Sequence, residues 1–213
     1  MHKLDAKELH VSISRGNAKM GLVPSVSLPP VKTCSPEAVK YCGRKCYVKR
    51  YVMRRQKTVG AAYERNLYLL QNEPEKFWRE VNGAVAMATH FRFGVSGDIP
   101  DLSYLEHIFK IAESNPHCEI LCFTKQYLIV HDALCLRVKD DIPKNLHIIL
   151  SAWKGLPMLN PYNLPEAHVF FKDGTTTAKD GAKYCSGNCY ECAMTNANCW
   201  SLKNGEQIIF KEH

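Results

Sequence analysis

Cysteine is the residue type in this chain whose spacing points most directly to chemistry. Seven of the ten cysteines fall into two short polar segments, at 34–46 and 184–200. In chain order, these seven are Cys34, Cys42, Cys46, Cys185, Cys189, Cys192 and Cys199. Buried structural cysteines usually occur in apolar elements, so packing does not explain this distribution. Thiolates bind zinc and iron–sulfur clusters, and we predict that all seven are metal ligands.

The spacing within each segment bears on the identity of the metal. The first segment has three cysteines and no neighbouring histidine, which does not suit a closed tetrahedral zinc site. Three thiolates suit a 4Fe-4S cubane with one open iron, and the four of the second segment suit a fully ligated one. We therefore predict iron–sulfur clusters. Zinc is the alternative, as are redox or disulfide chemistry and a single site that shares ligands from both segments.

The other three cysteines lie in apolar segments. Cys118 and Cys122 share one face of a predicted strand, and Cys135 lies in a predicted apolar helix. This placement is typical of structural thiols, so we expect these three to be buried.

Charge and length set further limits. The formal net charge is +7. No apolar stretch approaches the roughly 20 residues that cross a bilayer. The segment 1–15 is polar and does not resemble a signal peptide. We therefore expect a cytoplasmic protein, where disulfides are rare and clustered cysteines more often bind metal.

A run of basic residues follows the second cysteine, with no acidic residue between positions 44 and 57. Its candidate anion or nucleic-acid contacts are Arg44, Lys45, Lys49, Arg50, Arg54 and Arg55. Such a run favours nucleic acid, a host protein or another anionic partner. Two alternatives remain, namely a solvated helix face and positive charge that offsets metal-bound thiolates.

Hydrophobic periodicity predicts the elements that must position these residues. The predicted strands are 10–14, 25–28, 91–95, 119–124, 146–152, 167–171 and 207–210. The predicted helices are 47–72, 74–89, one that begins at Asp101 or Ser103, and 126–138. Short apolar strands alternating with amphipathic helices predict an α/β fold with a parallel sheet. We expect a single domain over 1–213 that resembles a partial (β/α) barrel, with both cysteine segments near the carboxyl ends of the strands.

Ligands of such sheets bind beyond the carboxyl ends of the strands. Ser96, Gly97 and Asp98 end the strand 91–95, so they are candidate cofactor contacts. Asp98 could contact an ammonium group, and Gly97 would let the backbone approach a ligand closely. Lys125 follows the next strand and is a candidate anion contact. The alternative for 96–98 is an ordinary turn between a strand and a helix.

Several short motifs together are similar to a bacteriophage and prophage family known as gene product eighty-eight. The similarity is carried by 16–21, 27–29, 32–34, 63–67, 96–98, Cys42, Cys46-Tyr47 and the closing Cys199-Trp200. It covers most of the chain, although the family's last cysteines usually lie closer together than Cys192 and Cys199 do here. The resemblance implies a phage or prophage origin and the cytoplasm of a bacterial host, but no particular reaction.

The layout also resembles, more distantly, that of radical S-adenosylmethionine enzymes. In those enzymes three cysteines follow the first barrel strand, and the amino group of the cofactor binds near the end of the second. The spacing in the loop that ends at Cys46 differs from that family's short motif. The resemblance implies S-adenosylmethionine as a possible cofactor. We therefore expect a redox or radical-type iron–sulfur enzyme. The alternative is a non-catalytic metal-stabilised module that binds nucleic acid or a host protein through its basic helix.

Overall fold

The computed structural model describes residues 9–17, 20–137 and 142–212. Their strands form one eight-stranded sheet in the order β1-β2-β3-β4-β5-β6-β8-β7. The strands are β1 (Ile13–Ser14), β2 (Ser25–Val26), β3 (His90–Phe93), β4 (Glu119–Thr124), β5 (Leu146–Ser151), β6 (Glu166–Phe170), β7 (Lys183–Tyr184) and β8 (Gln207–Lys211). Only β1 is antiparallel to its neighbour, and all pairs from β2 to β7 are parallel. This confirms the predicted α/β fold.

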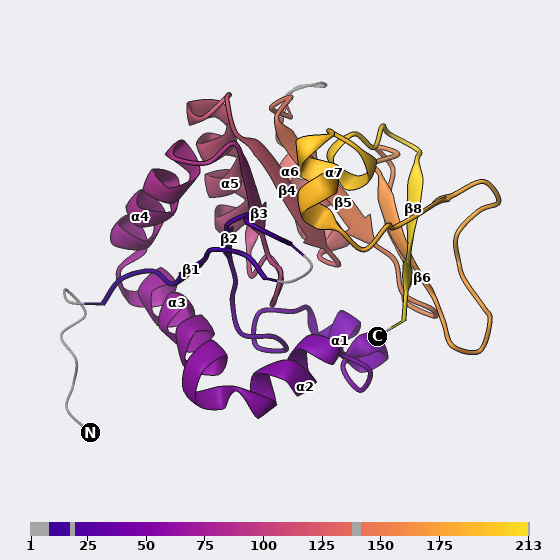
Figure 1. Ribbon diagram of the computed structural model, residues 1–213, viewed down its shortest axis with the longest axis horizontal. Helices are drawn as coiled ribbons and strands as arrows, with labels where there is room; N and C mark the ends of the chain where they lie inside the picture. The colour runs from indigo at the N-terminus through magenta and orange to yellow at the C-terminus, as the bar shows by residue number, and fades with distance from the viewer. Residues whose placement is uncertain (1–8, 18–19, 138–141, 213) are drawn as a thin grey trace.

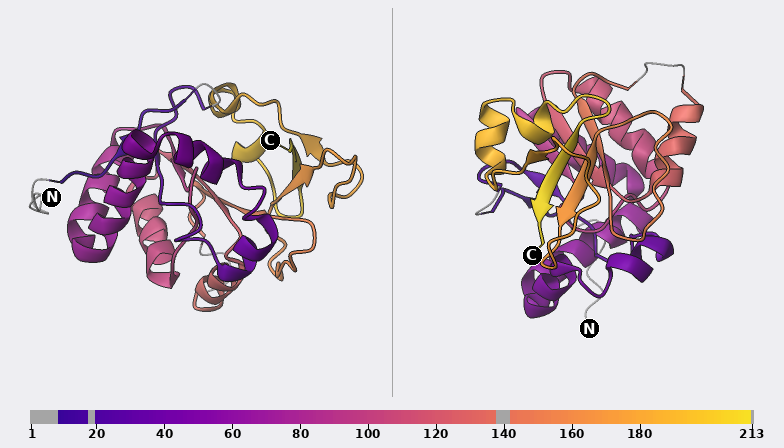
Figure 2. Two further views of the ribbon diagram at one scale, coloured as in Figure 1. Left: turned by 90° about the horizontal axis from the view of Figure 1, so that it is seen from below. Right: turned by 90° about the vertical axis from the view of Figure 1, so that its right-hand side faces the viewer.

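The order of the strands gives the sheet its barrel-like character. From β2 to β6 each strand pairs with the next one along the chain, so the sheet grows in one direction. A doubly wound sheet would reverse direction in the middle, whereas a (β/α) barrel does not. The curved sheet with helices around its outside is visible in Figures 1 and 2. Among the described residues β1 and β7 each pair on one side only, so the barrel is partial.

Helices flank the sheet between β2 and β5. They are α1 (Pro36–Cys42), α2 (Tyr47–Arg54), a π-helix η2 (Gln56–Gly60), α3 (Ala61–Asn72), α4 (Pro74–Ala86), α5 (Leu102–Ser114) and α6 (Tyr127–Cys135). The backbone N–H of Tyr104 donates to the Asp101 carboxylate at 2.8 Å, which caps α5 as its sequence predicts. The second cysteine segment contains α7 (Cys189–Met194) and a 3₁₀ turn η3 (Asn198–Trp200).

Two apolar cores lie on opposite faces of the sheet. On the outer face, Phe91 and Ile120 pack against α4, α5 and α6. On the inner face, Leu121 and Ile149 pack with residues of the second cysteine segment, among them Trp200. Alternate residues of a strand point to opposite faces, so neighbours such as Ile120 and Leu121 belong to different cores. The inner face is therefore covered by the end of the chain rather than by a helix of the alternating pattern.

The structure differs from the predicted elements mainly in the helices. The predicted helix 47–72 is divided into α2, η2 and α3, and the break lies before Gly60. Helices α1 and α7 lie in segments predicted to be loops. Residue 138 of the predicted helix 126–138, and residues 18–19 of the first family motif, lie outside the described residues. Within the described ranges, no helix is both long enough and apolar enough to cross a membrane.

Candidate metal centres

The first cysteine group lies where the chain leaves the carboxyl end of β2. Cys34 precedes Ser35, whose side chain caps the start of α1, and Cys42 ends that helix. Cys46 caps α2, and its Sγ accepts a hydrogen bond from the backbone N–H of Lys49 at 3.4 Å. The ends of two short helices thus hold the three thiols, at the carboxyl edge of the sheet as predicted.

The pKa values of two of these thiols are raised, chiefly by burial. The pKa of Cys34 is raised to about 11, chiefly by burial and also by Asp98, Cys42 and Cys46, against a backbone hydrogen bond that lowers it. Burial also raises the pKa of Cys42, while the ammonium of Lys125 lowers it. The raised pKa values of Cys34 and Cys42 favour their protonated forms, and a bound metal would displace those protons.

Asp98 and Lys125 hold this edge of the sheet in place. One carboxylate oxygen of Asp98 accepts from the Thr124 hydroxyl at 2.5 Å and the Ile99 N–H at 2.9 Å. The other accepts from the backbone N–H of Lys125 at 2.9 Å. The Lys125 ammonium donates to the Ser151 hydroxyl at 2.9 Å. Although these contacts favour the carboxylate, burial outweighs them and raises the pKa of Asp98.

The other two residues of the predicted cofactor site support the first cysteine loop. The Ser96 hydroxyl donates to the Leu28 carbonyl at 3.0 Å. Gly97 has a φ of +74°, and a Cβ there would lie 2.5 Å from Thr33 Oγ1. The Thr33 hydroxyl in turn donates to the Pro29 carbonyl at 3.0 Å. The turn at 96–98 therefore packs directly on the loop that leads to the first thiol, and cofactor binding by these residues stays a prediction.

The second cysteine group lines one small cavity. Cys185 follows β7, two more cysteines lie on α7, and the last is in η3. The cavity is lined by Cys185, Cys189, Cys192 and Cys199 together with Arg92, Asn188, Asn198, Leu121, Phe123, Trp200 and Phe210. The Asn198 amide donates to the Sγ of Cys192 at 3.0 Å. Burial raises the pKa of Cys199 to about 12, and the other three thiols of the group raise it too, against Arg92, which lowers it.

This second group does not lie where the sequence analysis placed it. Trp200 is only 2% exposed and contacts the rings of His90 and His147, with centroids 5.0 Å and 6.2 Å apart. His90 is the first residue of β3 and His147 is the second residue of β5, so both lie at the amino ends of their strands. The segment therefore packs on the inner face of the sheet, as Figure 1 shows for α7, and only the first group lies at the carboxyl ends. The reason is the apolar inner face, which needs a cover that none of the helices α1 to α6 supplies.

Arg92 is a site residue that the sequence analysis missed. It lies in β3 between Phe91 and Phe93, which point to the outer core, so its side chain lies on the inner face. Its guanidinium is 4.8 Å from the Phe123 ring centroid. Its Nε is buried and has no hydrogen-bond partner among the described residues. A charged residue inside an otherwise apolar strand was the signal that could have identified it.

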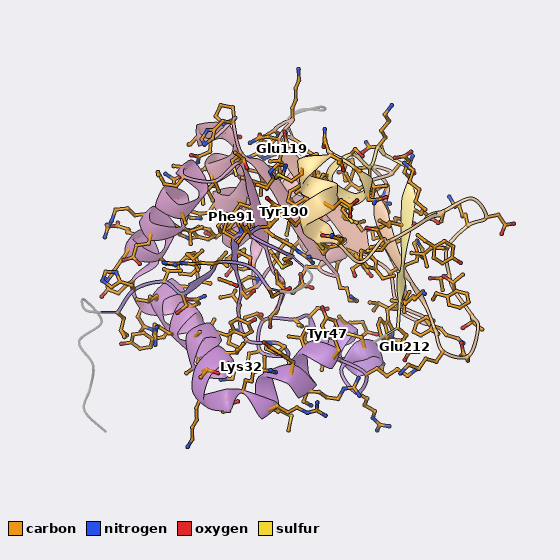
Figure 3. All side chains as sticks on the ribbon, in the orientation of Figure 1. Lys32, Tyr47, Phe91, Glu119, Tyr190 and Glu212 are labelled. Atoms are coloured by element: carbon orange, nitrogen blue, oxygen red, sulfur yellow. The ribbon has the colours of Figure 1, made fainter. Side chains whose placement is uncertain are left out.

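Tyr47 connects the two groups. It directly follows Cys46, and the residue as a whole is 48% exposed. Burial of the hydroxyl raises the pKa of Tyr47, Arg92 lowers it, and both Cys46 and Cys189 raise it. Its hydroxyl is thus within electrostatic reach of a thiol from each group. Figure 3 shows Tyr47 on α2, which Cys46 caps, and Tyr190 on α7, which carries Cys189 and Cys192.

The remaining cysteines differ among themselves. Cys118 and Cys122 are buried in the outer core, as predicted. The prediction for Cys135 is wrong, because its thiol is exposed and lies 3.0 Å from the Tyr162 hydroxyl. It is the last residue of α6 and is not among the buried residues of that helix. All ten cysteines are free thiols.

The predicted basic contacts are exposed on the surface. All six lie on α2 or in the short segments beside it. Lys45 forms an ion pair with Glu212, and the Arg55 guanidinium lies 4.4 Å from the Tyr51 ring centroid. The cations that act on the cysteine pKa values are Lys125 and Arg92 instead. This run therefore remains a candidate partner surface.

The spacing of the thiols bears on the size of a bound group. In the part of the chain that the structure describes, no three His, Cys, Asp or Glu side chains are arranged to hold a metal ion. A zinc ion needs thiolates that converge to about 2.3 Å from one point. The described residues therefore give direct support neither to a zinc ion nor to an iron–sulfur cluster, and both stay predictions.

Comparison with known proteins gives a family but no described relative. The model of the family Gene product 88 matches residues 6–156, which include the first cysteine group, Tyr47 and Arg92 but not the second group. Neither the curated proteins nor the solved structures contain a match. The match spans well over half of the sequence, and the chain belongs to the Gene product 88 family.

Proposed function

We propose that this phage-type protein is an iron–sulfur protein with two cluster sites inside one partial barrel. Cys34, Cys42 and Cys46 would bind one cluster, and the four thiols that line the inner cavity would bind the other. The observation that carries the proposal is this cavity. It combines four thiols from a single segment with a buried guanidinium nitrogen that lacks a partner among the described residues. Buried polar groups are nearly always satisfied, so an acceptor is expected there.

The donor set and the charges at each site fit this class of cofactor. A cubane carries about −2 with four thiolates and about −1 with three. Arg92 borders the group of four, and Lys125 lies near Cys42 in the group of three. Buried charge is costly unless it is paired. One cation at each site would offset the charge of a cluster there.

The first site suits a reactive role better than the second. A cubane held by three thiolates keeps one iron open and supplies one-electron chemistry there. The ammonium of Lys125 is held near Cys42 by Ser151 and could bind an anionic group of a ligand. S-adenosylmethionine is the candidate ligand. Asp98 would act mainly by holding Thr124 and Lys125, because both of its oxygens accept hydrogen bonds from its own chain.

Anaerobic purification with metal and sulfide analysis tests the proposal. Two cubanes predict about eight irons and eight sulfides per chain and a brown protein. About four of each would instead support one shared site. A colourless protein that contains zinc, or no metal after reconstitution with iron and sulfide, would overturn the proposal.

A second candidate function is favoured by the surface of α2. The six basic residues of this region are exposed, and no acidic residue lies between 44 and 57. A metal-stabilised module could bind nucleic acid through this helix, because phosphate contacts require cations on an accessible surface. Binding that persists in metal-loaded protein without any redox activity would favour this candidate.

A further inference from the structure

We infer that Arg92 is a positioning residue of the second cluster, where its guanidinium donates hydrogen bonds to cluster sulfur and raises the reduction potential. The inference rests on the proposed function, because it assumes a cluster in the inner cavity. It goes further by assigning a role to a residue that is not a ligand. It also predicts a difference between the two sites.

The position of Arg92 is fixed by the sheet. It is the third residue of β3, between two phenylalanines of the outer core, and it pairs in register with Leu121 of β4. The strand therefore projects it into the inner cavity, where the four thiols also lie. The Phe123 ring, 4.8 Å away, restricts where the guanidinium can lie. A strand residue is a more rigid support than a loop for such a contact.

The state of its donors points to a missing acceptor. The Nε of Arg92 is buried, with no hydrogen-bond partner among the described residues. An unsatisfied buried donor is costly, and the cost is higher for a charged group. The thiol of Cys192 already receives the Asn198 amide at 3.0 Å. Cluster sulfur in the cavity would give the Arg92 donor an acceptor that the described part of the chain does not provide.

Such a contact acts on the redox equilibrium. Reduction adds one electron to the cluster, so the reduced form carries one more negative charge. Hydrogen bonds to sulfur and a nearby cation stabilise that form and raise the potential. Lys125 is the corresponding cation at the first site, where the thiols are partly exposed. The two sites thus differ in which cation controls them.

A redox titration of the reconstituted chain, with dithionite as reductant and electron paramagnetic resonance as readout, tests the inference. Arg92→Gln removes the charge, and the reduction equilibrium constant of one cluster should fall at least about tenfold, which is about 59 mV for one electron. Arg92→Lys keeps the charge but loses the planar donor, so an intermediate fall is expected. Arg79→Gln, an equal charge change at an exposed position of α4, should leave both potentials unchanged.

The outcomes separate this inference from the proposed function. If the wild-type chain binds no cluster, the proposed function fails, and the inference fails with it. If the iron content is complete but Arg92→Gln shifts neither potential, only the inference is overturned. An Arg92→Lys potential equal to that of the wild type would overturn the role of the Nε donor. Circular dichroism of each variant checks that the sheet is folded.

Discussion

The ammonium of Lys45 lies 3.0 Å from the carboxylate of Glu212. This ion pair joins the first cysteine loop to the residue that follows β8, so it links segments from opposite ends of the chain. Glu212 also accepts a hydrogen bond from the backbone N–H of Lys172 at 2.8 Å. These partners hold the pKa of Glu212 below its usual value. Figure 3 shows Glu212 on the same side of the molecule as Tyr47.

The two partners of this pair should contribute unequally to stability. Lys45→Ala removes one exposed contact, and exposed ion pairs contribute little. Glu212→Ala removes the same contact and also leaves the N–H of Lys172 without its acceptor. Urea unfolding should therefore show a lower midpoint for Glu212→Ala than for Lys45→Ala. Equal midpoints would contradict a separate role for the hydrogen bond from Lys172.

Glu166 should make stability depend on acid pH. Desolvation raises the pKa of Glu166, but hydrogen bonds from Asn160, His168 and Gln207 outweigh it, and the pKa lies below the usual 4.5. A lowered carboxyl pKa in the folded state stabilises the fold above the unfolded pKa, and this stability is lost as pH falls through the folded pKa.

Urea unfolding at a series of pH values measures this dependence. The wild type should lose more stability than Glu166→Gln between about pH 5 and about pH 3. Glu75→Gln, at an exposed position of α4, is the matched control and should follow the wild type. A Glu166→Gln variant that loses as much stability on acidification as the wild type would contradict the account.

Much of the scaffold could be predicted from the sequence, but less of the site. Strand β4 has the predicted bounds, because a short apolar run between polar residues has one clear interpretation. Helix α7 was missed, because cysteine and polar residues there hide a helical period. The inner location of the second group depends on where Trp200 packs, which is a tertiary contact. Arg92 was missed because a single charge in a strand carries no periodic signal.

The position of Tyr47 leads us to expect that clusters bound at the two proposed sites would interact magnetically. Its hydroxyl lies near Cys46 of the first group and Cys189 of the second. If both sites hold clusters and both are reduced, the clusters should broaden or split each other's electron paramagnetic resonance signals. A spectrum of the fully reduced protein that equals the sum of two single-cluster variants would contradict this proximity.

The basic surface predicts salt-dependent binding of nucleic acid if the second candidate function holds. Lys49→Glu and Arg54→Glu together should weaken duplex DNA binding and reduce the slope of log K against log salt by about 0.9 per lost phosphate contact. Lys110→Glu, at an exposed position of α5, is the control. If the double variant and the control bind equally well, this surface does not bind DNA.

The central proposal is that the two cysteine groups bind separate clusters. Counting iron in three anaerobically purified variants tests it most directly. Cys42→Ala and Cys192→Ala should each lose about four irons per chain, since each removes a ligand of a different cubane. Cys135→Ala, an exposed thiol outside both groups, should keep them all. Iron contents that match the wild type in all three variants would contradict the assignment of these thiols as ligands.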